Sequence, residues 1–297
     1  MEDKILNLIN LNKYELLGEG FISKSYRLEI NSRKYILLQG QIGDSYKCYF
    51  RAYNSLIFLL NNGKPLIKSI QIPFNDINLI KPNQNNPFFK FGGLIYLEIE
   101  GLIFYEKYFN KMNIEKITDK IADFLKELYS IPVDYNKTNE IRNKKILEFK
   151  SDMNVLKNYF KDKNIDKINI FEKEYLDYIN NFNDFHYMHG DLWEENMIIS
   201  EDCQELIGVV DFDNFGICDI AKDYASLLDF DFDFLYKLMD KTKDIVKDKD
   251  EFIKRILIYQ KLIELEDTAY ILRDKKLENR LKSKIIKLKK LNLISFN

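Results

Sequence analysis

The sequence has few cysteines and no long hydrophobic run. Its three cysteines, Cys48, Cys203 and Cys218, are too few and too scattered for a disulfide framework or a zinc site, so we interpret them as buried, reduced thiols. Apolar stretches such as "LIYLEIEGLIF" are interrupted by charge well before the ~20 residues that a membrane-spanning helix needs. The N-terminal stretch lacks the basic, apolar and small-residue regions of a signal peptide. We therefore expect a cytoplasmic protein that does not act on membranes.

The composition is that of a folded globular protein with an uneven distribution of charge. Hydrophobic residues make up 46% of the 297 residues, enough to fill one large domain or two lobes. The net charge is only -2, but residues 181–233 hold 14 Asp and Glu and a single basic residue, Lys222. Several of these acids stand beside aliphatic or aromatic residues. A carboxylate in a cleft needs a cation, which can be a metal, an arginine or a basic ligand.

The N-terminal third predicts an antiparallel sheet. The stretches "YELLGEG", "SKSYRLEI" and "RKYILLQG" alternate apolar and polar residues, and the turn-forming "GEG" and "NSR" separate them. We expect a helix at residues 46–60 to follow, and then strands at 67–72 and 94–99.

After Gly101 the pattern becomes helical. The stretch "IEKITDKIADFLKELYSI" places its apolar residues on one helix face. We expect further helices at residues 146–160, 168–179, 220–239 and 252–273. A basic amphipathic helix should end the chain, and we interpret its charges as a solvated face because no aromatic residues alternate with them for nucleic acid. The strand signals of this half are "NMIIS" and "LIGVV", which predict a hairpin and, with the N-terminal sheet, an α+β fold.

Two motifs on this hairpin carry the chemistry. "YMHGDLWEENMIIS" places Asp191 five residues before Asn196, and "LIGVVDFDNFG" ends an aliphatic run in Asp211. Asn196 and Asp211 suit Mg2+, a hard ion that takes oxygen ligands. Asp191 is not needed as a ligand and could accept a proton from a hydroxyl. Alone, each aspartate would more simply cap a turn or end a strand, but their spacing together favours phosphoryl transfer.

These motifs resemble the aminoglycoside phosphotransferase and choline kinase superfamily, small-molecule relatives of the protein kinases. "HGDLWEEN" and "VVDFDNFGICDIAKDYASLL" carry the likeness, which is greatest to the aminoglycoside 2''-phosphotransferases and the macrolide kinases, while "HGDLW" is also similar to fructosamine kinases. The resemblance implies a bilobal protein-kinase-like fold. Residues 1–95 would form the nucleotide-binding lobe, 96–101 the hinge, and 102–297 the helical catalytic and substrate-binding lobe.

The resemblance also implies roles for individual residues. In "LLGEGFISKSYRL" it implies a loop over the nucleotide phosphates, and in "IYLEIEG" the hinge that contacts the base. The "GEG" alone is weak evidence, since such glycines often only turn a hairpin. The roles by motif position are catalytic base, Asp191; Mg2+ ligands, Asn196 and Asp211; structural residues, His189, Asp219 and Asp223; nucleotide contacts, Gly18, Gly20, Ser23, Gln39, Tyr96, Glu98 and Ile99; substrate contacts, Asp191, Glu194, Glu264 and Asp267.

One departure from the family concerns the phosphate-binding lysine. The family carries a lysine in the middle of the strand "RKYILLQGQ", where this sequence has Leu37, Leu38 and Gln39, and the helix "YKCYFRAYNSLIFLL" lacks the glutamate that pairs with it. The joint absence is self-consistent, because losing one member alone would leave an unpaired buried charge. Gln39, or Lys34 in another strand register, could contact phosphate instead. Otherwise phosphate binding must rest on Mg2+ and on backbone N–H groups of "GEGFIS".

The sequence therefore predicts a Mg2+-dependent kinase, a monomer or dimer that binds no nucleic acid. It would transfer the terminal phosphate of ATP or GTP to a hydroxyl of a small cationic acceptor such as an aminoglycoside. In "LIELEDTAY", Glu264 and Asp267 share roughly one helix face toward such an acceptor, although ordinary surface charge explains them equally well. Two alternatives stay open: a housekeeping choline, sugar or fructosamine-type kinase, and a nucleotide-binding pseudokinase.

Overall fold

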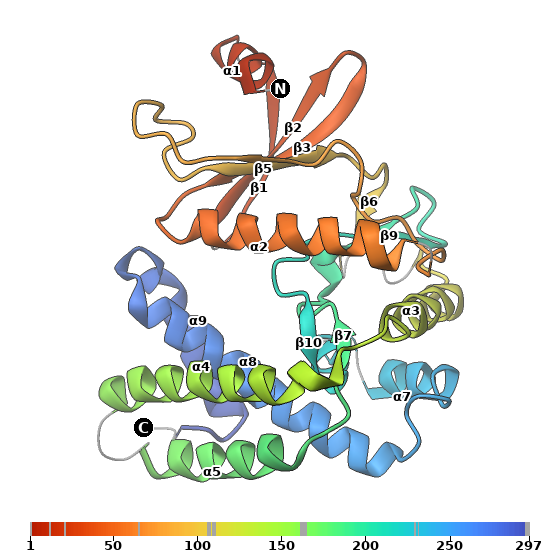
Figure 1. Cartoon of the computed structure of the whole chain (residues 1–297), viewed down its shortest axis with the longest axis vertical. Coiled ribbons are helices and arrows are strands. Elements are labelled where there is room, and N and C mark those ends of the chain that lie inside the picture. Colours follow the sequence, from red (N-terminus) through yellow and green to blue (C-terminus); the bar gives the residue numbers. More distant parts are fainter. Residues whose placement is uncertain are drawn as a thin grey trace. The chain divides into compact units, whose positions relative to one another are not determined.

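The structure is a computed structural model of the whole chain (Figure 1). It describes residues 2–11, 13–20, 22–64, 66–105, 108, 111–160, 165–228, 230 and 232–294, so Phe21 of the glycine-rich stretch lies outside the described residues. The chain divides into two compact units. The first comprises Met1–Ile131, His189–Gly216 and Tyr236–Thr242; the second comprises Pro132–Met188, Ile217–Leu235 and Lys243–Asn297.

A five-stranded antiparallel sheet forms the N-terminal part of the first unit, as the sequence predicted. The strand order is β1-β2-β3-β5-β4. The strands are β1 (Tyr14–Glu19), β2 (Ser23–Ile30), β3 (Arg33–Gly40), β4 (Asn78–Ile80) and β5 (Gly93–Leu97). The short strand β4 was not predicted. β3 lies between β2 and β5, so both of its backbone edges are paired.

Two helices cover opposite faces of this sheet (Figure 1). Helix α1 (Glu2–Asn10), which the sequence analysis missed, places Ile5 in one apolar cluster with Leu37 of β3. Helix α2 (Ser45–Phe58) continues as a π-helical turn (Leu59–Gly63) and packs on the other face, where Leu38 joins the second cluster. Neighbouring residues of β3 therefore point to different clusters, which follows from the alternation of side chains along a strand.

The first unit also contains a small sheet and helix α3 (Ile114–Tyr129), whose predicted apolar face is buried. The small sheet has the order β6-β8-β9, from β6 (Leu102–Ile103), β8 (Met197–Ile199) and β9 (Leu206–Val209). The expected strand at 67–72 is wrong. That segment makes only an isolated bridge, from Gln71 to Gly208. Pro73 follows at once, and a proline cannot donate to a strand ladder.

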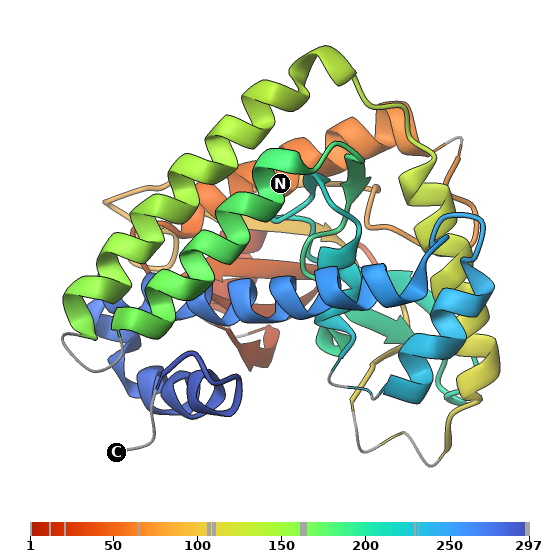
Figure 2. The same ribbon diagram turned by 90° about the horizontal axis from the view of Figure 1, so that it is seen from below.

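The second unit is mainly helical. Figure 2 shows α4 (Thr138–Tyr159), α5 (Ile165–Asn181) and α8 (Lys249–Arg273) lying alongside one another. A two-stranded sheet pairs β7 (His186–Met188) with β10 (Gly216–Cys218), which the sequence did not predict. The chain then forms a 3-10 helix (Lys275–Arg280) and the predicted basic helix α9 (Leu281–Lys290). Within the described residues, no helix combines the length and the apolar character that crossing a membrane requires.

The predicted helix at 220–239 is wrong in its continuity. It consists of two helices, α6 (Ala221–Ser226) and α7 (Phe232–Lys241). The sequence between them, "LLDFD", contains two aspartates and a phenylalanine, and these residues have lower helix propensity than leucine. The helix expected at 146–160 also begins earlier, at Thr138.

Candidate active site

The hairpin of β8 and β9 brings Asn196 close to Asp211. The two strands pair antiparallel with Met197 opposite Val209, so the residue before β8 faces the residues that follow β9. Accordingly, the backbone N–H of Val210 donates to the carbonyl of Asn196 at 2.9 Å. The predicted hairpin is confirmed, and both expected metal ligands stand at the same end of it.

Asn196 also contacts Asp191, the expected base. Its side-chain nitrogen Nδ2 lies 2.8 Å from the Asp191 backbone carbonyl and 3.3 Å from Oδ2 of the same residue. Because the amide nitrogen is directed at Asp191, Oδ1 of Asn196 is the atom left to act as a hard oxygen ligand. The amide therefore fixes the loop that carries Asp191 and at the same time presents an oxygen.

His189 braces this loop from inside. The imidazole is fully buried, it accepts a hydrogen bond from the Asp191 backbone N–H at Nδ1 (3.3 Å), and its Nε2 lies 3.0 Å from the Val210 carbonyl. An accepting Nδ1 leaves the proton on Nε2, which then donates to Val210. Burial lowers the pKa of His189 to about 4. The ring is therefore neutral at pH 7 and joins the two halves of the site, which fits the bracing role that the resemblance implied.

Gly190 allows a close approach between two loops of the site. Its φ is +85°, a region that favours glycine, and a Cβ at this position would lie 2.3 Å from the Asn214 carbonyl oxygen. A larger residue would therefore push apart the loop of Asp191 and the loop that follows Asp211.

Asp211 lies where negative charge is concentrated. Its backbone adopts φ +64°, an uncommon value for a residue other than glycine and one that is frequent at functional sites. The side chain remains accessible to solvent but is surrounded by protein. Desolvation by that protein, followed by repulsion from Asp213 and Asp191, raises the pKa of Asp211 well above its usual range. A bound cation would relieve this repulsion.

The residues present fit a magnesium ion. Within the described residues, no three or more His, Cys, Asp and Glu are grouped closely enough to hold a metal by themselves. Mg2+ does not require such a cage, because it usually takes one or two protein oxygens and completes its shell with water and phosphate. Asn196 and Asp211 supply two such oxygens, and the mutual repulsion of the neighbouring carboxylates favours a cation there.

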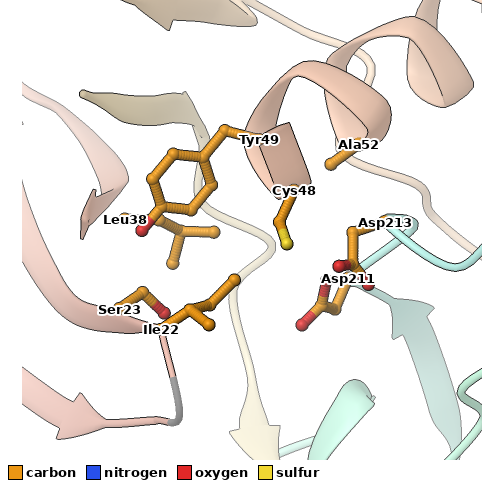
Figure 3. Close-up of a pocket in the computed structure, with 8 residues that line it drawn as sticks. All are labelled: Ile22, Ser23, Leu38, Cys48, Tyr49, Ala52, Asp211 and Asp213. Atoms are coloured by element: carbon orange, nitrogen blue, oxygen red, sulfur yellow. The ribbon is translucent and has the colours of Figure 1, made fainter. Parts of the chain in front are cut away.

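A small pocket opens beside Asp211 (Figure 3). Asp211 and Asp213 stand side by side on one side of it, with Leu38 and Ser23 on the other. The remaining lining residues are Ile22, Cys48, Tyr49 and Ala52. Three of the lining residues come from α2, two from the loop after β9, and the others from β2, β3 and Ile22 just before β2. The pocket is thus bounded by the sheet expected to cover a nucleotide and by the expected metal ligand.

Gln39, an expected nucleotide contact, is not among the residues that line this pocket. Leu38 lines the pocket, so Gln39 points to the other face of β3. There it is buried and accepts a hydrogen bond from the Tyr26 hydroxyl (3.2 Å), while its own Nε2 donates to the Phe88 carbonyl (2.6 Å). Lys34 lies four residues from Leu38, about 13 Å along the strand. Neither residue lines the pocket beside Asp211.

The described glycines of the glycine-rich stretch lie where the pairing of β1 and β2 is irregular. The register of β1 and β2 shifts between Leu16 and Gly18, and the Gly20 N–H donates to the Ser23 carbonyl at 2.8 Å. A Cβ on Gly18 would meet nothing within 4 Å, so packing does not demand this glycine. Ser23 lines the pocket. These positions remain expected nucleotide contacts.

The expected hinge is held by side chains of the first unit. Tyr96 is buried beneath α2, and the Glu98 carboxylate binds Nε and Nη2 of Arg27 at 2.6–3.0 Å. Ile99 packs closely against Gly208 of β9, and a Cβ added to Gly208 would lie 2.9 Å from Cγ2 of Ile99. Because these side chains are engaged, a nucleotide base at the hinge would contact backbone groups and not side chains.

In the second unit, Asp219 and Asp223 are fully buried. Asp219 forms an ion pair with Arg255 (3.1 Å) and accepts hydrogen bonds from the Tyr178 hydroxyl and from the Ala221 backbone N–H (3.0 Å). Burial raises the pKa of Asp219 to about 6 despite these contacts. Its partners tie α5, α6 and α8 together, which is consistent with the expected structural role.

The acids expected to bind substrate from α8 already have partners in the same unit. Glu264 is buried and binds Lys284 (2.9 Å) and Lys287 (3.1 Å) of α9, and Asp267 binds Lys284 at 2.5 Å. Glu194, the other expected substrate contact, lies in the first unit, in the single 3-10 turn before β8. It is partly buried there.

Several residues at or beside the pocket received no functional role from sequence reasoning. Asp213 stands in the quoted "DFDNFG", two positions after Asp211, but received no role. Cys48 and Tyr49 line the pocket, and burial raises the pKa of the Cys48 thiol to about 11. Arg51 contacts both Cys48 and Asp213. Arg51 could have been noticed in the sequence, because it is a basic residue one helical turn after Cys48 in the same predicted helix that lacks the expected glutamate.

Comparison with known proteins identifies a family for the chain. The sequence profile described as "Phosphotransferase enzyme family" (APH) matches residues 13–243. No curated protein matches the chain by sequence. Among solved structures, a gentamicin complex of APH(2'')-IIa is 20% identical, with a TM-score of 0.68 over 97% of this chain and 96% of that one.

Two further structures are similar over nearly the full length. ADP-bound aminoglycoside phosphotransferase APH(2'')-Ib is 19% identical, with a TM-score of 0.68 over 100% of both chains. A type I macrolide 2'-phosphotransferase is 14% identical, with a TM-score of 0.63 over 100% of this chain and 97% of that one. At these identities the likeness establishes the fold, the α+β protein-kinase-like architecture expected from the sequence.

Proposed function

We propose that the chain, which belongs to the phosphotransferase enzyme family, is a Mg2+-dependent kinase that phosphorylates a hydroxyl of a small molecule. ATP or GTP would supply the phosphate. One observation carries the proposal: Asp191, Asn196 and Asp211 meet at one end of the β8–β9 hairpin beside a pocket under β2 and β3. Phosphoryl transfer needs little else from a protein than such positioned oxygens and charges.

Each residue would have a distinct task. Asp191 would orient the acceptor hydroxyl and take its proton as the acceptor oxygen bonds to the terminal phosphorus and the bond to the leaving nucleoside diphosphate breaks. Asn196 and Asp211 would hold Mg2+, which neutralises phosphate charge when bound. His189, neutral and buried, keeps the Asp191 loop against Val210.

For the acceptor we favour a cationic small molecule such as an aminoglycoside. The support is the charge of residues 181–233, with 14 acids against one basic residue. Asp191 and Glu194 are the proposed contacts. Glu264 and Asp267 would contribute only if the acceptor displaced Lys284 from them.

A pseudokinase is the second candidate, and Leu38 is the observation that favours it. A leucine lines the pocket where the family's lysine is expected, which leaves that wall without a positive charge. A scaffold would bind nucleotide but would transfer no phosphate.

Thermal-shift measurements with ATP and GTP, each with and without Mg2+, test the nucleotide site. Phosphate-transfer assays against aminoglycosides, macrolides, choline and sugars then test the reaction. We expect stabilisation by nucleotide with Mg2+ and transfer to at least one acceptor class. Stabilisation without transfer to any acceptor would support the pseudokinase, and no stabilisation by either nucleotide would contradict both candidates.

A further inference from the structure

The pocket beside Asp211 lacks a positive charge on its walls. Two of its eight lining residues, Asp211 and Asp213, are acidic and none is basic, and the strand position that faces it holds Leu38. A nucleoside triphosphate carries several negative charges on its phosphates. A single Mg2+ would have to offset those charges together with the two aspartates, so a further cation near the pocket is needed for a favourable balance.

Most basic side chains on the surrounding elements are engaged elsewhere. On β2, Lys24 points to the face away from the pocket, and Arg27 binds the hinge carboxylate through two nitrogens. On β3, Arg33 and Lys34 lie at the far end of the strand, about 13 Å or more from the pocket. On α2, Lys47 is 74% exposed and pairs with Asp44, the residue just before the helix.

Arg51 of α2 differs from these residues. Its Nη2 lies 3.1 Å from Sγ of Cys48 and 3.5 Å from Oδ2 of Asp213, and its Nε lies 3.3 Å from the Asp213 carbonyl. Both partners line the pocket, so the guanidinium lies directly behind its wall. The contacts with Asp213 are long, the side chain is 53% exposed, and Nη1 makes no hydrogen bond among the described residues. The group can therefore reorient and still has donors to offer.

We propose that Arg51 supplies the positive charge for the phosphates of the nucleotide, and that Asp213 positions its guanidinium at the pocket. The inference rests on the proposed function, because it requires a nucleotide in this pocket. The arrangement differs from the one expected in the family, where a lysine of the strand pairs with a glutamate of the helix. Here the cation comes from the helix, and its acidic partner comes from the loop after β9. A guanidinium suits this task, since its planar donors match phosphate oxygens in pairs.

The test compares Arg51→Met with the wild type by calorimetric titration with ADP, in EDTA and in excess Mg2+. Methionine keeps an unbranched apolar stem and removes the charge. We expect wild-type protein to retain affinity in EDTA and Arg51→Met to lose it by ~10- to 100-fold, the size of a charge-assisted hydrogen bond. Lys47→Met, one turn earlier on the same helix and exposed, is the matched control and should bind as wild type does.

A rescue variant separates a phosphate contact from a merely structural role. Leu38→Lys, added to Arg51→Met, returns a cation to the pocket from the strand and should restore most of the lost affinity in EDTA. The proposal is overturned if Arg51→Met binds ADP in EDTA as wild type does, if wild type binds only with Mg2+, or if the lysine restores nothing. Failure of the wild type to bind ADP even with Mg2+ would contradict the proposed function itself.

Discussion

The ammonium group of Lys284 lies 2.9 Å from the carboxylate of Glu264. Both side chains are largely buried, at 12% and 6% exposure, and Lys287 approaches the other oxygen of the same carboxylate. A second acid, Asp267, shares Lys284. The acids of α8 that the sequence assigned to a cationic acceptor therefore join α8 to α9.

From this pairing we expect Glu264→Gln to lower stability more than acceptor affinity. Breaking a buried ion pair on one side leaves an uncompensated charge and costs about 3 kcal/mol or more. Urea unfolding measures that loss, and the KM for a cationic acceptor should change less than about threefold. Glu266→Gln is the matched control, because Glu266 is more exposed and its contact with Lys222 is longer, at 3.4 Å. A large rise in KM with unchanged stability would show instead that Glu264 binds the acceptor.

The β8–β9 hairpin was predictable because its signals are local. "NMIIS" and "LIGVV" are two short apolar stretches separated by the polar connection "EDCQE", and a connection this short favours antiparallel pairing of its two neighbours. The face on which a residue of β3 lies was not predictable. The stretch "YILLQ" is apolar at four of five positions, so no polar alternation tells which side faces the pocket, where the structure places Leu38 and not Gln39.

Long-range partners were equally hidden from sequence reasoning. Arg51 and Asp213 are 162 residues apart, and Lys284 is 20 residues from Glu264. Their contacts depend on how helices pack, which no local pattern encodes. The motif around Asp191 needed no such knowledge, since its elements lie within one short loop and one hairpin.

Asp191→Asn should abolish turnover while the fold and nucleotide binding persist. The substitution removes the group that orients and deprotonates the acceptor, a contribution of typically ~100- to 10,000-fold. The backbone carbonyl that receives the Asn196 hydrogen bond is unchanged, so the loop should keep its conformation. Once an acceptor is identified, kcat and ADP affinity are measured side by side. A kcat within about threefold of wild type would refute the assignment of Asp191.

Asp211→Ala should remove the Mg2+-dependent part of nucleotide affinity. The carboxylate is the expected anchor of the ion that joins protein and phosphates. Calorimetric titration with ADP, with and without Mg2+, gives the difference directly. Asp202→Ala serves as control, because Asp202 lies in the exposed turn of the same hairpin and hydrogen-bonds only locally, to Ser200 and Gln204. Equal metal dependence in wild type and Asp211→Ala would contradict the ligand role.

The buried imidazole of His189 should make stability fall as the solution is acidified. Its pKa is about 4 in the folded protein because of burial, against 6.5 for the unperturbed group. Between pH 6.5 and 4, His189 is therefore protonated in the unfolded chain and neutral in the folded chain. The contribution of His189 is fully present above pH 6.5 and is lost as the pH falls toward 4. At pH 5 the loss relative to pH 7.5 should be about 2 kcal/mol, at ~1.4 kcal/mol per pKa unit.

The measurement is the free energy of unfolding in urea at pH 7.5 and pH 5 for the wild type and for His189→Gln. Carboxylates such as Asp219 titrate in the same interval, and a raised folded-state pKa acts in the opposite direction. Only the difference between the two proteins therefore isolates the imidazole. We expect His189→Gln to be less stable at pH 7.5 but to lose about 2 kcal/mol less on acidification. His186→Gln, which alters the more exposed histidine paired with Asp184, is the control. If His189→Gln and the wild type lose the same amount, His189 is not held neutral by burial.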